Sequence, residues 1–257
     1  MHIYTYWVNQ NNSDMPVYLK LCMRSWYKAI PGAKICLINQ ANIMQFLPKT
    51  LLTASFFNLP LAMQSDVVSV WVLLSRGGLF LDVDTIMTRN PFTNNVFNPA
   101  RLCAFGYEER KQIHLAVMFS QQRKNALLYA WITEVAKKLA KPLPSPLPWD
   151  WVGNSIINIL LREPSLQESV QILDAGDYGN ILELSITEET PFNRYMKYYF
   201  TPPVCPLEET ILKVKGGMIS LHNSWTPEIY RKATLQEIVK SRDSLMLSHL
   251  LVNILEP

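Results

Sequence analysis

Hydrophobic and polar residues alternate with changing periods at the start of the chain, and the changes predict a strand, a helix and a second strand. The segment Ile3–Val8 is rich in aromatic and β-branched residues, which favours a strand. Pro16 then opens a segment whose apolar residues recur at helical spacing, namely Leu19, Met23, Trp26 and Tyr27. The apolar segment Lys34–Asn39 reads as the next strand. Strand, helix and strand of these lengths predict a right-handed βαβ unit and a parallel sheet.

A second and stronger alternation begins at Pro60. Apolar residues again recur at helical spacing, namely Val67, Val70, Trp71 and Leu74. Gly77 and Gly78 end this helix, and Leu79–Asp84 follows as a strand that terminates in two acids. The next expected elements are strands at Leu102–Tyr107 and Ile113–Ser120 and a helix at Asn125–Lys141. Helices and strands in alternation predict the α/β class, a sheet flanked by helices.

Prolines at alternate positions interrupt the pattern at Pro142–Pro148. Proline in this arrangement excludes both a helix and a central strand, so we expect an extended loop. Such a loop fits either a domain boundary or a cover over an active site. Beyond it we expect a helix at Val152–Leu161, a strand at Met218–Leu221 and a helical tail at Pro227–Leu255.

Composition narrows the class of protein. The 257 residues are 49% hydrophobic and 18% charged, which provides for a large core and argues against disorder. The net charge is only +3 and the basic residues are scattered, so nucleic acid is not an expected partner. A weakly positive charge is compatible with peripheral association with an anionic membrane surface.

Cysteines and the start of the chain bear on the compartment. The four cysteines, Cys22, Cys36, Cys103 and Cys205, form no CxxC pair, and Cys22 and Cys36 fall in apolar segments that favour buried, reduced thiols. We see neither a signal peptide nor a run of about 18 apolar residues that would span a membrane. We therefore expect a cytoplasmic protein, in solution or at the inner face of the cell membrane.

The sharpest chemical feature is the pair of acids at the end of the third predicted strand. A buried strand that ends in Asp82-Val83-Asp84 presents carboxylates at the usual ligand crevice of an open α/β sheet. If the strand continues through Asp84, its alternation places Asp82 and Asp84 on one side and Val83 in the core. Two like charges this close repel each other unless a cation or a proton joins them. Mg²⁺ or Mn²⁺ would take carboxylate oxygens and then donor phosphates as ligands.

Several segments together resemble a known family. Ser65-Asp66 at the start of a helix, Gly77-Gly78 and Asp82-Val83-Asp84 resemble the donor-site signature of glycosyltransferase family 32. The nearest likeness is to the bacterial capsular polysaccharide synthesis glycosyltransferases of the DXD sugar-binding type. Three more segments agree in order, namely Tyr6-Trp7, Ser25-Trp26 and His222-Asn223-Ser224-Trp225. The resemblance covers residues 3 to 226, weakly through the middle, and implies a GT-A fold, a nucleotide-sugar donor and a divalent cation.

The resemblance also implies roles for single residues around the cation. Asp82 would contact the ribose, the donor sugar or the metal, and Asp84 would be a direct metal ligand. His222 would complete the metal site, which a position just after an apolar strand also favours. Ser224 and Trp225 would reach the diphosphate.

The donor side of the implied site contains one departure from the family. Asp66 would hold hydroxyls of the donor sugar, and Tyr6 and Trp7 would lie near the base. The family reads Ser-Asp-x-x-Arg, but Ser69 occupies the arginine position here. Either Arg76 substitutes for that arginine or the donor is bound differently, so the sugar is left open.

The segment after the proline loop, Trp149-Asp150-Trp151-Val152-Gly153-Asn154, has two interpretations. Aromatic faces stack on pyranose rings and carboxylates bind hydroxyls, which suits a sugar site with Asp150 and Asn154 near the reaction centre. Alternatively, Asp150 caps a helix over packed tryptophans. The resemblance here is to a small-residue segment that lines the reaction centre.

These inferences combine into one functional prediction. We expect a metal-dependent, retaining transfer of a hexose, galactose or glucose, from a UDP-sugar in surface polysaccharide or glycoconjugate synthesis. The acceptor would be a glycan, a glycoprotein or a lipid-linked oligosaccharide. One GT-A catalytic domain would comprise residues 1–257, with a nucleotide-sugar-binding part at 1–141, an acceptor and active-site part at 142–226 and C-terminal helices at 227–257.

Two other functions compete with this prediction. A phosphatase of the haloacid dehalogenase type also ends a strand in Asp-x-Asp, but it needs Gly-Thr next and a later Gly-Asp-x-x-x-Asp. Thr85-Ile86 follows here, and Gly176-Asp177 is not continued to the second acid. A non-catalytic sugar-binding module is the other alternative. It would bind glycans without consuming a donor.

Overall fold

The computed structural model of the chain describes residues 1–9, 14–93, 96–110, 112–121, 123–179, 189–203, 209–210 and 213–256. These residues divide into two compact units that are interleaved along the sequence. The first unit comprises residues 1–8, 34–82 and 97–173, and the second comprises residues 9–33, 83–96 and 174–257. The expected parts at 1–141, 142–226 and 227–257 were defined by function and not by compactness, and they stay a prediction.

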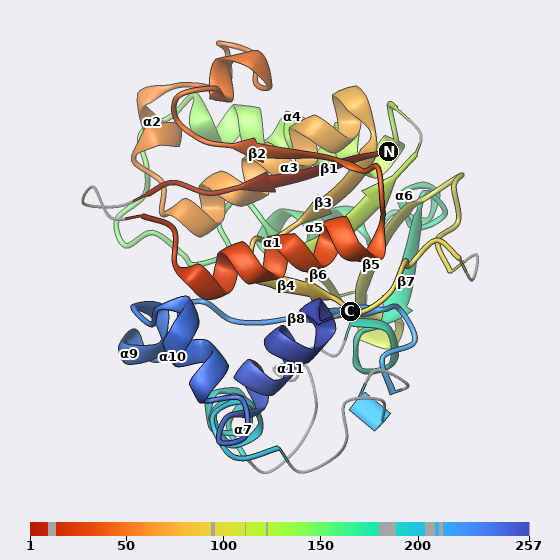
Figure 1. Cartoon of the computed structure of the whole chain (residues 1–257). Helices are drawn as coiled ribbons and strands as arrows, with labels where there is room; N and C mark the ends of the chain where they lie inside the picture. The colour runs from red at the N-terminus through yellow and green to blue at the C-terminus, as the bar shows by residue number, and fades with distance from the viewer. Residues whose placement is uncertain are drawn as a thin grey trace. The chain divides into compact units, whose positions relative to one another are not determined.

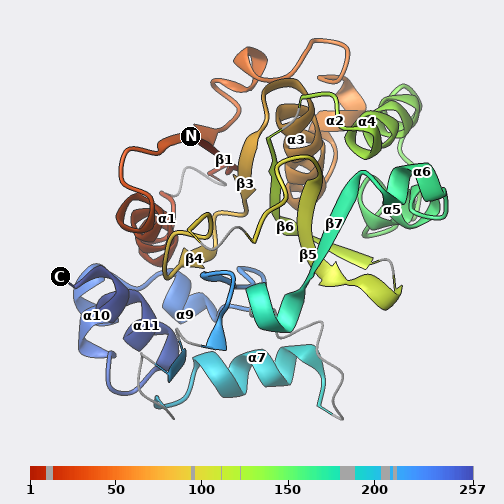
Figure 2. The same ribbon diagram turned by 90° about the vertical axis from the view of Figure 1, so that its right-hand side faces the viewer.

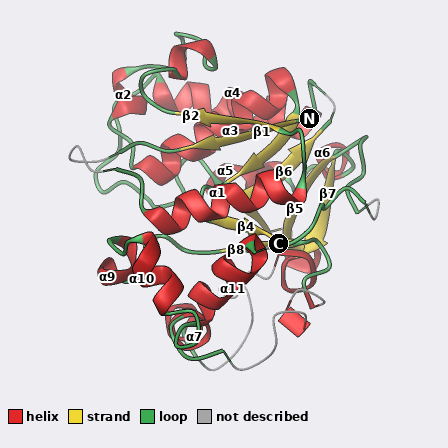
Figure 3. Cartoon of the chain, in the orientation of Figure 1, coloured by secondary structure: helices red, strands yellow, loops and turns green. Residues whose placement is uncertain are grey.

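The first unit is built on a six-stranded sheet in the order β2-β1-β3-β6-β5-β7. The strands are β1 His2–Tyr6, β2 Lys34–Ile38, β3 Gly78–Leu81, β5 Leu102–Tyr107, β6 Gln112–Ser120 and β7 Val170–Asp174. β1 is parallel to β2 and to β3, whereas β6 is antiparallel to β3 and to β5. The strands are yellow in Figure 3. The parallel pairing of β1 and β2 confirms the prediction, and β6 makes the sheet mixed.

Helices cover the sheet of the first unit. They are α2 Ala54–Phe57, α3 Leu61–Arg76, α4 Ala126–Leu139, α5 Asn154–Leu160 and α6 Pro164–Gln167, with short 3₁₀ turns at Ile43–Gln45 and Glu108–Arg110. α3 packs on β1, β3 and β6, and α4 lies between α3 and α5 (Figure 2). α3 begins after Pro60, as predicted. Residues 142–148 contain neither helix nor strand, which confirms the extended loop.

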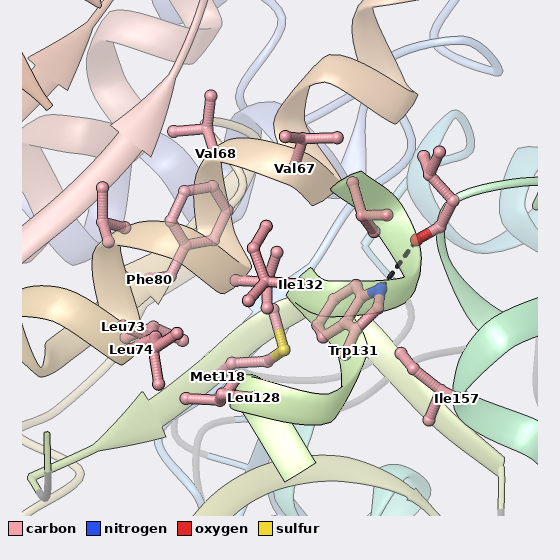
Figure 4. Packing of buried hydrophobic residues seen from close by; sticks show 14 of the residues in the cluster. Val67, Val68, Leu73, Leu74, Phe80, Met118, Leu128, Trp131, Ile132 and Ile157 are labelled. Carbon is pink, nitrogen blue, oxygen red and sulfur yellow. Dashed lines mark hydrogen bonds between the residues drawn. The ribbon is translucent and has the colours of Figure 1, made fainter. Parts of the chain in front are cut away.

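A continuous hydrophobic core joins these layers. Figure 4 shows Val67, Phe80, Met118 and Trp131 from the helices and the sheet packed together, and each of these side chains is buried. Burial of large apolar side chains is the main favourable term in folding. The indole N–H of Trp131 is satisfied inside the core, because it donates to the carbonyl oxygen of Val152 at 2.7 Å.

Two glycines make the turn from α3 into β3. Gly77 has a φ of 67° and Gly78 has a φ of 117°, a region that favours glycine. A β-carbon on Gly77 would lie 2.9 Å from the carbonyl oxygen of Ser120, and one on Gly78 would lie 2.8 Å from that of His2. Only glycine therefore lets the chain pass between its neighbours and deliver β3 to the middle of the sheet.

The second unit contains a two-stranded sheet and most of the remaining helices. Its elements are α1 Val17–Ala29, β4 Thr85–Met87, a π-helical turn at Ala175–Gly179, α7 Pro191–Tyr199, β8 Met218–Ser220, α9 Glu228–Arg231, α10 Leu235–Lys240 and α11 Met246–Leu255. β4 pairs antiparallel with β8, and α1 packs on β4 and α11 (Figure 1). α1 buries Leu19 and Trp26, whereas Tyr27, which recurs at the same helical spacing, is exposed. The helical tail is confirmed.

The structure also bears on membranes and thiols. Within the described ranges, no helix is both long and apolar enough to cross a bilayer. Cys22 and Cys103 are buried free thiols, and Cys36 is a half-buried free thiol. Cys205 lies outside the described residues.

Candidate active site

The acidic motif lies in a turn rather than in a strand. β3 ends at Leu81, and the backbone N–H of Asp82 still donates to the carbonyl oxygen of Ala116 at 2.7 Å. Residues 82–84 then leave the sheet, and β4 begins at Thr85. The predicted strand to Asp84 was wrong in its last residues, because β4 pairs with β8 instead of continuing along β6. The boundary between the two units falls between Asp82 and Val83, so the two acids belong to different units.

Asp82 lies with other acids of the first unit. Its Oδ1 accepts a hydrogen bond from Ser65 Oγ, in the second turn of α3, at 3.3 Å. Asp66 follows Ser65, and burial raises the pKa of its carboxyl well above the usual range. The negative charges of Asp82 and Asp150 raise that pKa further. The first unit therefore brings together three carboxylates that the sequence separates widely.

Gly153 brings the segment after the proline loop against Asp66. A β-carbon at residue 153 would lie 2.9 Å from Oδ2 of Asp66 and 3.0 Å from Cδ1 of Leu115. A side chain here would force one of them to move, so glycine permits the close approach of the backbone. Asn154 begins α5, and its buried Oδ1 has no hydrogen-bond partner among the described residues. A buried polar atom without a partner is costly and stands ready for a ligand donor.

Asp84 has different surroundings in the second unit. Its side chain is buried, and Oδ2 accepts a hydrogen bond from the backbone N–H of Asn223 at 2.7 Å. Its carbonyl oxygen accepts from the backbone N–H of Leu221 at 3.1 Å. The pairing of β4 with β8 produces this contact, because Thr85 lies opposite Ser220. The side-chain oxygen of Asn223 in turn accepts a hydrogen bond from the hydroxyl of Tyr18, in α1.

A closed ring of hydrogen bonds shapes the turn that carries His222. The backbone N–H of His222 donates to the Tyr195 hydroxyl at 3.3 Å, and Thr226 Oγ1 donates to the His222 carbonyl oxygen at 2.9 Å. Thr226 has only one hydroxyl proton, so the 3.0 Å bond between Tyr195 and Thr226 has Tyr195 as its donor. The His222 ring stacks on Trp225, with centroids 3.9 Å apart and planes 29° apart.

The charge of Asp84 reaches the same tyrosines. Burial raises the pKa of the Tyr18 and Tyr195 hydroxyls well above the usual range, and the carboxylate of Asp84 raises both further. Both hydroxyls therefore stay protonated and act as hydrogen-bond donors toward the turn. Asp84, the turn at residues 222–226 and the two tyrosines form one connected polar network within the second unit.

The other residues of the predicted donor site are Tyr6, Trp7 and Ser224. Tyr6 is buried, its hydroxyl donates to Gln64 Oε1 at 2.6 Å, and burial raises its pKa to about 12. Trp7 is half-buried and donates its backbone N–H to Ile38. Ser224 is exposed.

Arg76 is not brought to the acids of the first unit. It ends α3, about 15 Å along the helix axis from Asp66. Its guanidinium lies 4.7 Å from the centroid of the Phe46 ring and donates to the Gln45 carbonyl oxygen. Ser69, at the family's arginine position, is buried and donates to the Asp66 carbonyl oxygen. The structure thus offers no cation from either position to the Asp66 carboxylate.

The chemistry of the motif can be compared with what a cation requires. Within the described ranges, no three His, Cys, Asp or Glu side chains come together as a metal site. Mg²⁺ and similar hard cations are commonly held by one or two carboxylates and completed by substrate phosphates. Both acids of the motif carry carboxylates, the ligand type that such a cation takes.

Comparison with known proteins indicates the class of enzyme. Residues 16–102 match the family of the glycosyltransferase sugar-binding region containing the DXD motif. The match covers about a third of the chain and supports its assignment as a glycosyltransferase enzyme. The matched range includes Asp66, Gly77 and both acids of the motif, so it covers the acid of α3 and the acids of the turn after β3. No curated protein matches the sequence.

Several solved structures are similar to this chain. The chain is similar to the glycosyltransferase GlyE of Streptococcus pneumoniae TIGR4, with 11% identity, a TM-score of 0.50, and coverage of 100% of this chain and 60% of that one. A galactosyltransferase LgtC, in complex with donor and acceptor sugar analogues, matches with 9% identity, a TM-score of 0.47, and coverage of 99% and 95%. The PaToxG glycosyltransferase matches with 13% identity, a TM-score of 0.46, and coverage of 62% and 68%. The glycosyltransferase fold of this chain is the predicted GT-A fold.

Sequence reasoning missed the residues that support the glycosyltransferase motif. Tyr18 and Tyr195 lie far from Asn223 and from each other in the sequence, and no local pattern links them. Their one visible signal is a tyrosine on the buried face of an amphipathic helix, where an apolar residue is more usual. Gly153 was part of the predicted small-residue segment, but its contact with Asp66 emerges only from the fold.

Proposed function

We propose that this glycosyltransferase moves galactose or glucose from a UDP-sugar to a glycan, a glycoprotein or a lipid-linked oligosaccharide in surface polysaccharide or glycoconjugate synthesis, with retention of anomeric configuration. The observation that carries the proposal is the acidic turn after β3, inside the matched sugar-binding region, with Asp84 tied to the backbone of the His222 turn. A buried carboxylate held by a backbone N–H is a defined ligand for a cation rather than a solvated surface acid.

Asp82, Asp84 and His222 would hold the divalent cation, Mn²⁺ or Mg²⁺. When bound, the cation neutralises negative charge on the diphosphate leaving group. Asp84 contributes a carboxylate whose orientation is fixed by Asn223. Trp225 supports the imidazole of His222 by stacking on its face. Exposed Ser224 supplies a hydroxyl that donates to a phosphate oxygen.

The first unit would recognise the sugar and the base. Asp66 accepts hydroxyl protons of the donor sugar, and Trp7 offers an aromatic face to the base. Because the Tyr6 hydroxyl already donates to Gln64, its part on the donor side is to position the strand end that carries Trp7. Asp150 and Asn154 stabilise positive charge that develops at the anomeric carbon, and same-face attack then needs no covalent intermediate.

Product analysis tests this proposal. Purified protein with Mn²⁺ and UDP-galactose or UDP-glucose should release UDP and form an α-linked product, which NMR of the anomeric proton identifies. The matched reactions contain excess chelator, or GDP-mannose in place of the UDP-sugar. A β-linked product contradicts retention, full activity in chelator contradicts the metal, and preference for GDP-mannose contradicts the nucleotide.

A further inference from the structure

One large aromatic side chain of the first unit stands out from the surface. Trp149 is 74% exposed at the end of the proline loop. Trp151, two residues later, packs against the core and has the Lys138 ammonium 5.1 Å from its ring centroid. The two tryptophans that flank Asp150 therefore have different environments: Trp149 is mostly exposed, whereas Trp151 is partly buried.

Trp149 is displayed from a well-anchored turn. The backbone N–H of Trp151 donates to the Pro148 carbonyl oxygen at 3.2 Å, which closes the turn around Trp149. The Asp150 carbonyl oxygen accepts from Gly153 N–H at 2.9 Å and from Ser155 Oγ at 2.7 Å. These bonds fix the backbone on both sides of the ring, so a ligand that stacks on it meets a preorganised surface.

Trp149 is adjacent in the sequence to a member of the acidic cluster. Asp150 follows it directly, and the charge of Asp150 acts on Asp66. Three residues further on, the backbone of Gly153 lies against the Asp66 carboxylate. An exposed apolar ring on the residue that precedes a carboxylate suits a pyranose, which has an apolar C–H face and a rim of hydroxyl donors. Sugar hydroxyls can donate to carboxylate oxygens while the C–H face covers the indole.

We propose that Trp149 is the stacking surface for the acceptor, a glycan whose pyranose ring covers the indole while Asp150 accepts one of its hydroxyl protons. The inference rests on the proposed function, because it names the second substrate of the same glycosyltransferase. It assigns to Trp149 a role that Trp151 does not share, since the Trp151 ring is used in packing.

A glycan array tests the assignment. Labelled wild-type protein is applied with Mn²⁺ and UDP, and the strongest glycan is then titrated against wild type, Trp149→Ala, Trp149→Phe and Tyr129→Ala. Tyr129 is the control, because it is also an aromatic residue of the first unit and is 65% exposed. It belongs to α4 and is not adjacent to Asp150 in the sequence. Thermal melts verify that each variant is folded.

The expected result is a loss of about tenfold in glycan affinity for Trp149→Ala, because the stacking area is removed. Trp149→Phe keeps an aromatic face and should lose about threefold or less, and Tyr129→Ala should bind as wild type does. In turnover assays, Trp149→Ala should raise the KM for that glycan and leave the KM for the UDP-sugar within about twofold.

Two results would overturn the assignment. One is a folded Trp149→Ala protein that binds the glycan as tightly as wild type. The other is a wild type that hydrolyses the UDP-sugar but binds no glycan of the array. A wild type that neither hydrolyses a UDP-sugar nor binds UDP fails at the proposed function instead, so the two failures are distinguishable.

Discussion

The two acids of the DXD motif are one residue apart, yet they have opposite kinds of surroundings. Asp82 is half-buried, accepts a 3.3 Å hydrogen bond from a serine hydroxyl and shares its unit with Asp66 and Asp150. Asp84 is 8% exposed and accepts a 2.7 Å hydrogen bond from the backbone N–H of Asn223.

This difference suits the two carboxylates to different roles in ligand binding. A side chain held by a backbone N–H cannot turn away without leaving that donor unsatisfied, so Asp84 is suited to fix a cation. Asp82 sits among carboxylates and hydroxyl groups, which suits contacts with a polar, hydroxyl-rich ligand.

Asp84→Asn should reduce turnover by about 10³-fold, roughly 4 kcal/mol of transition-state stabilisation. The amide oxygen can still accept from Asn223, so the melting temperature should change little while the charge for the cation is lost. Initial rates with a UDP-sugar measure the effect. Asp243→Asn is the control, because Asp243 is an exposed acid of the same unit and should behave as wild type. Near-wild-type turnover in Asp84→Asn would refute its role.

Asp150→Ala and Asn154→Ala should each reduce turnover by about 10²-fold or less, because each removes one interaction with a developing positive charge. The anomeric configuration of the product should stay α in both. Complete loss of activity in one variant, with rescue by azide, would instead indicate a covalent intermediate.

Tyr195→Phe and Tyr18→Phe should each raise the Mn²⁺ concentration for half-maximal activity by about fivefold, the worth of one positioning hydrogen bond. The first opens the ring around His222, and the second releases Asn223. Maximal turnover at saturating Mn²⁺ should change less than the Mn²⁺ requirement. Tyr230→Phe is the matched control, because it removes a buried hydroxyl that is bonded to Ser248 instead. If Tyr230→Phe raised the Mn²⁺ requirement equally, the effect would come from general destabilisation and not from the network around His222.

Asp66→Asn tests the acidic cluster of the first unit through stability in chelator. The pKa of Asp66 is raised in the folded protein, so the folded state holds its proton more tightly than the unfolded state. Stability should therefore fall as the pH rises from about 4, the usual pKa of Asp, toward the raised value. Asp66→Asn should remove part of this fall and melt higher than wild type near pH 7, with no difference at acidic pH. Identical pH profiles would contradict the raised pKa of Asp66, which burial and the two neighbouring acids cause.

Much of the first unit followed from the sequence. Aromatic, β-branched and apolar segments predicted β1 and β2, helical spacing predicted α3, and Gly77-Gly78 marked the turn into β3. These patterns involve residues that are close together in the sequence, so they can be read without knowledge of the long-range contacts. The DXD signature likewise pointed to a glycosyltransferase before any geometry was known, and the family match confirmed it.

What the sequence could not provide depends on long-range pairing. The end of β3 at Leu81 depends on β8, a strand distant in the sequence that pairs with β4. The partner of Asp84 depends on the same pairing, and its tyrosine supports come from α1 and α7. Arg76 was a candidate donor ligand only because it is an arginine near the expected position. At the end of α3, its guanidinium instead lies over the Phe46 ring.

Calorimetric titration of UDP tests the central claim most directly. The account predicts that wild type binds UDP in Mn²⁺, that chelator abolishes or greatly weakens this binding, and that Asp84→Asn in Mn²⁺ behaves like wild type in chelator. GDP should bind more weakly than UDP, and Trp7→Ala should weaken UDP binding in Mn²⁺ by a smaller factor than Asp84→Asn. Equal UDP affinity for wild type with and without Mn²⁺, unaffected by Asp84→Asn, would contradict the claim that the DXD turn binds the donor through a cation.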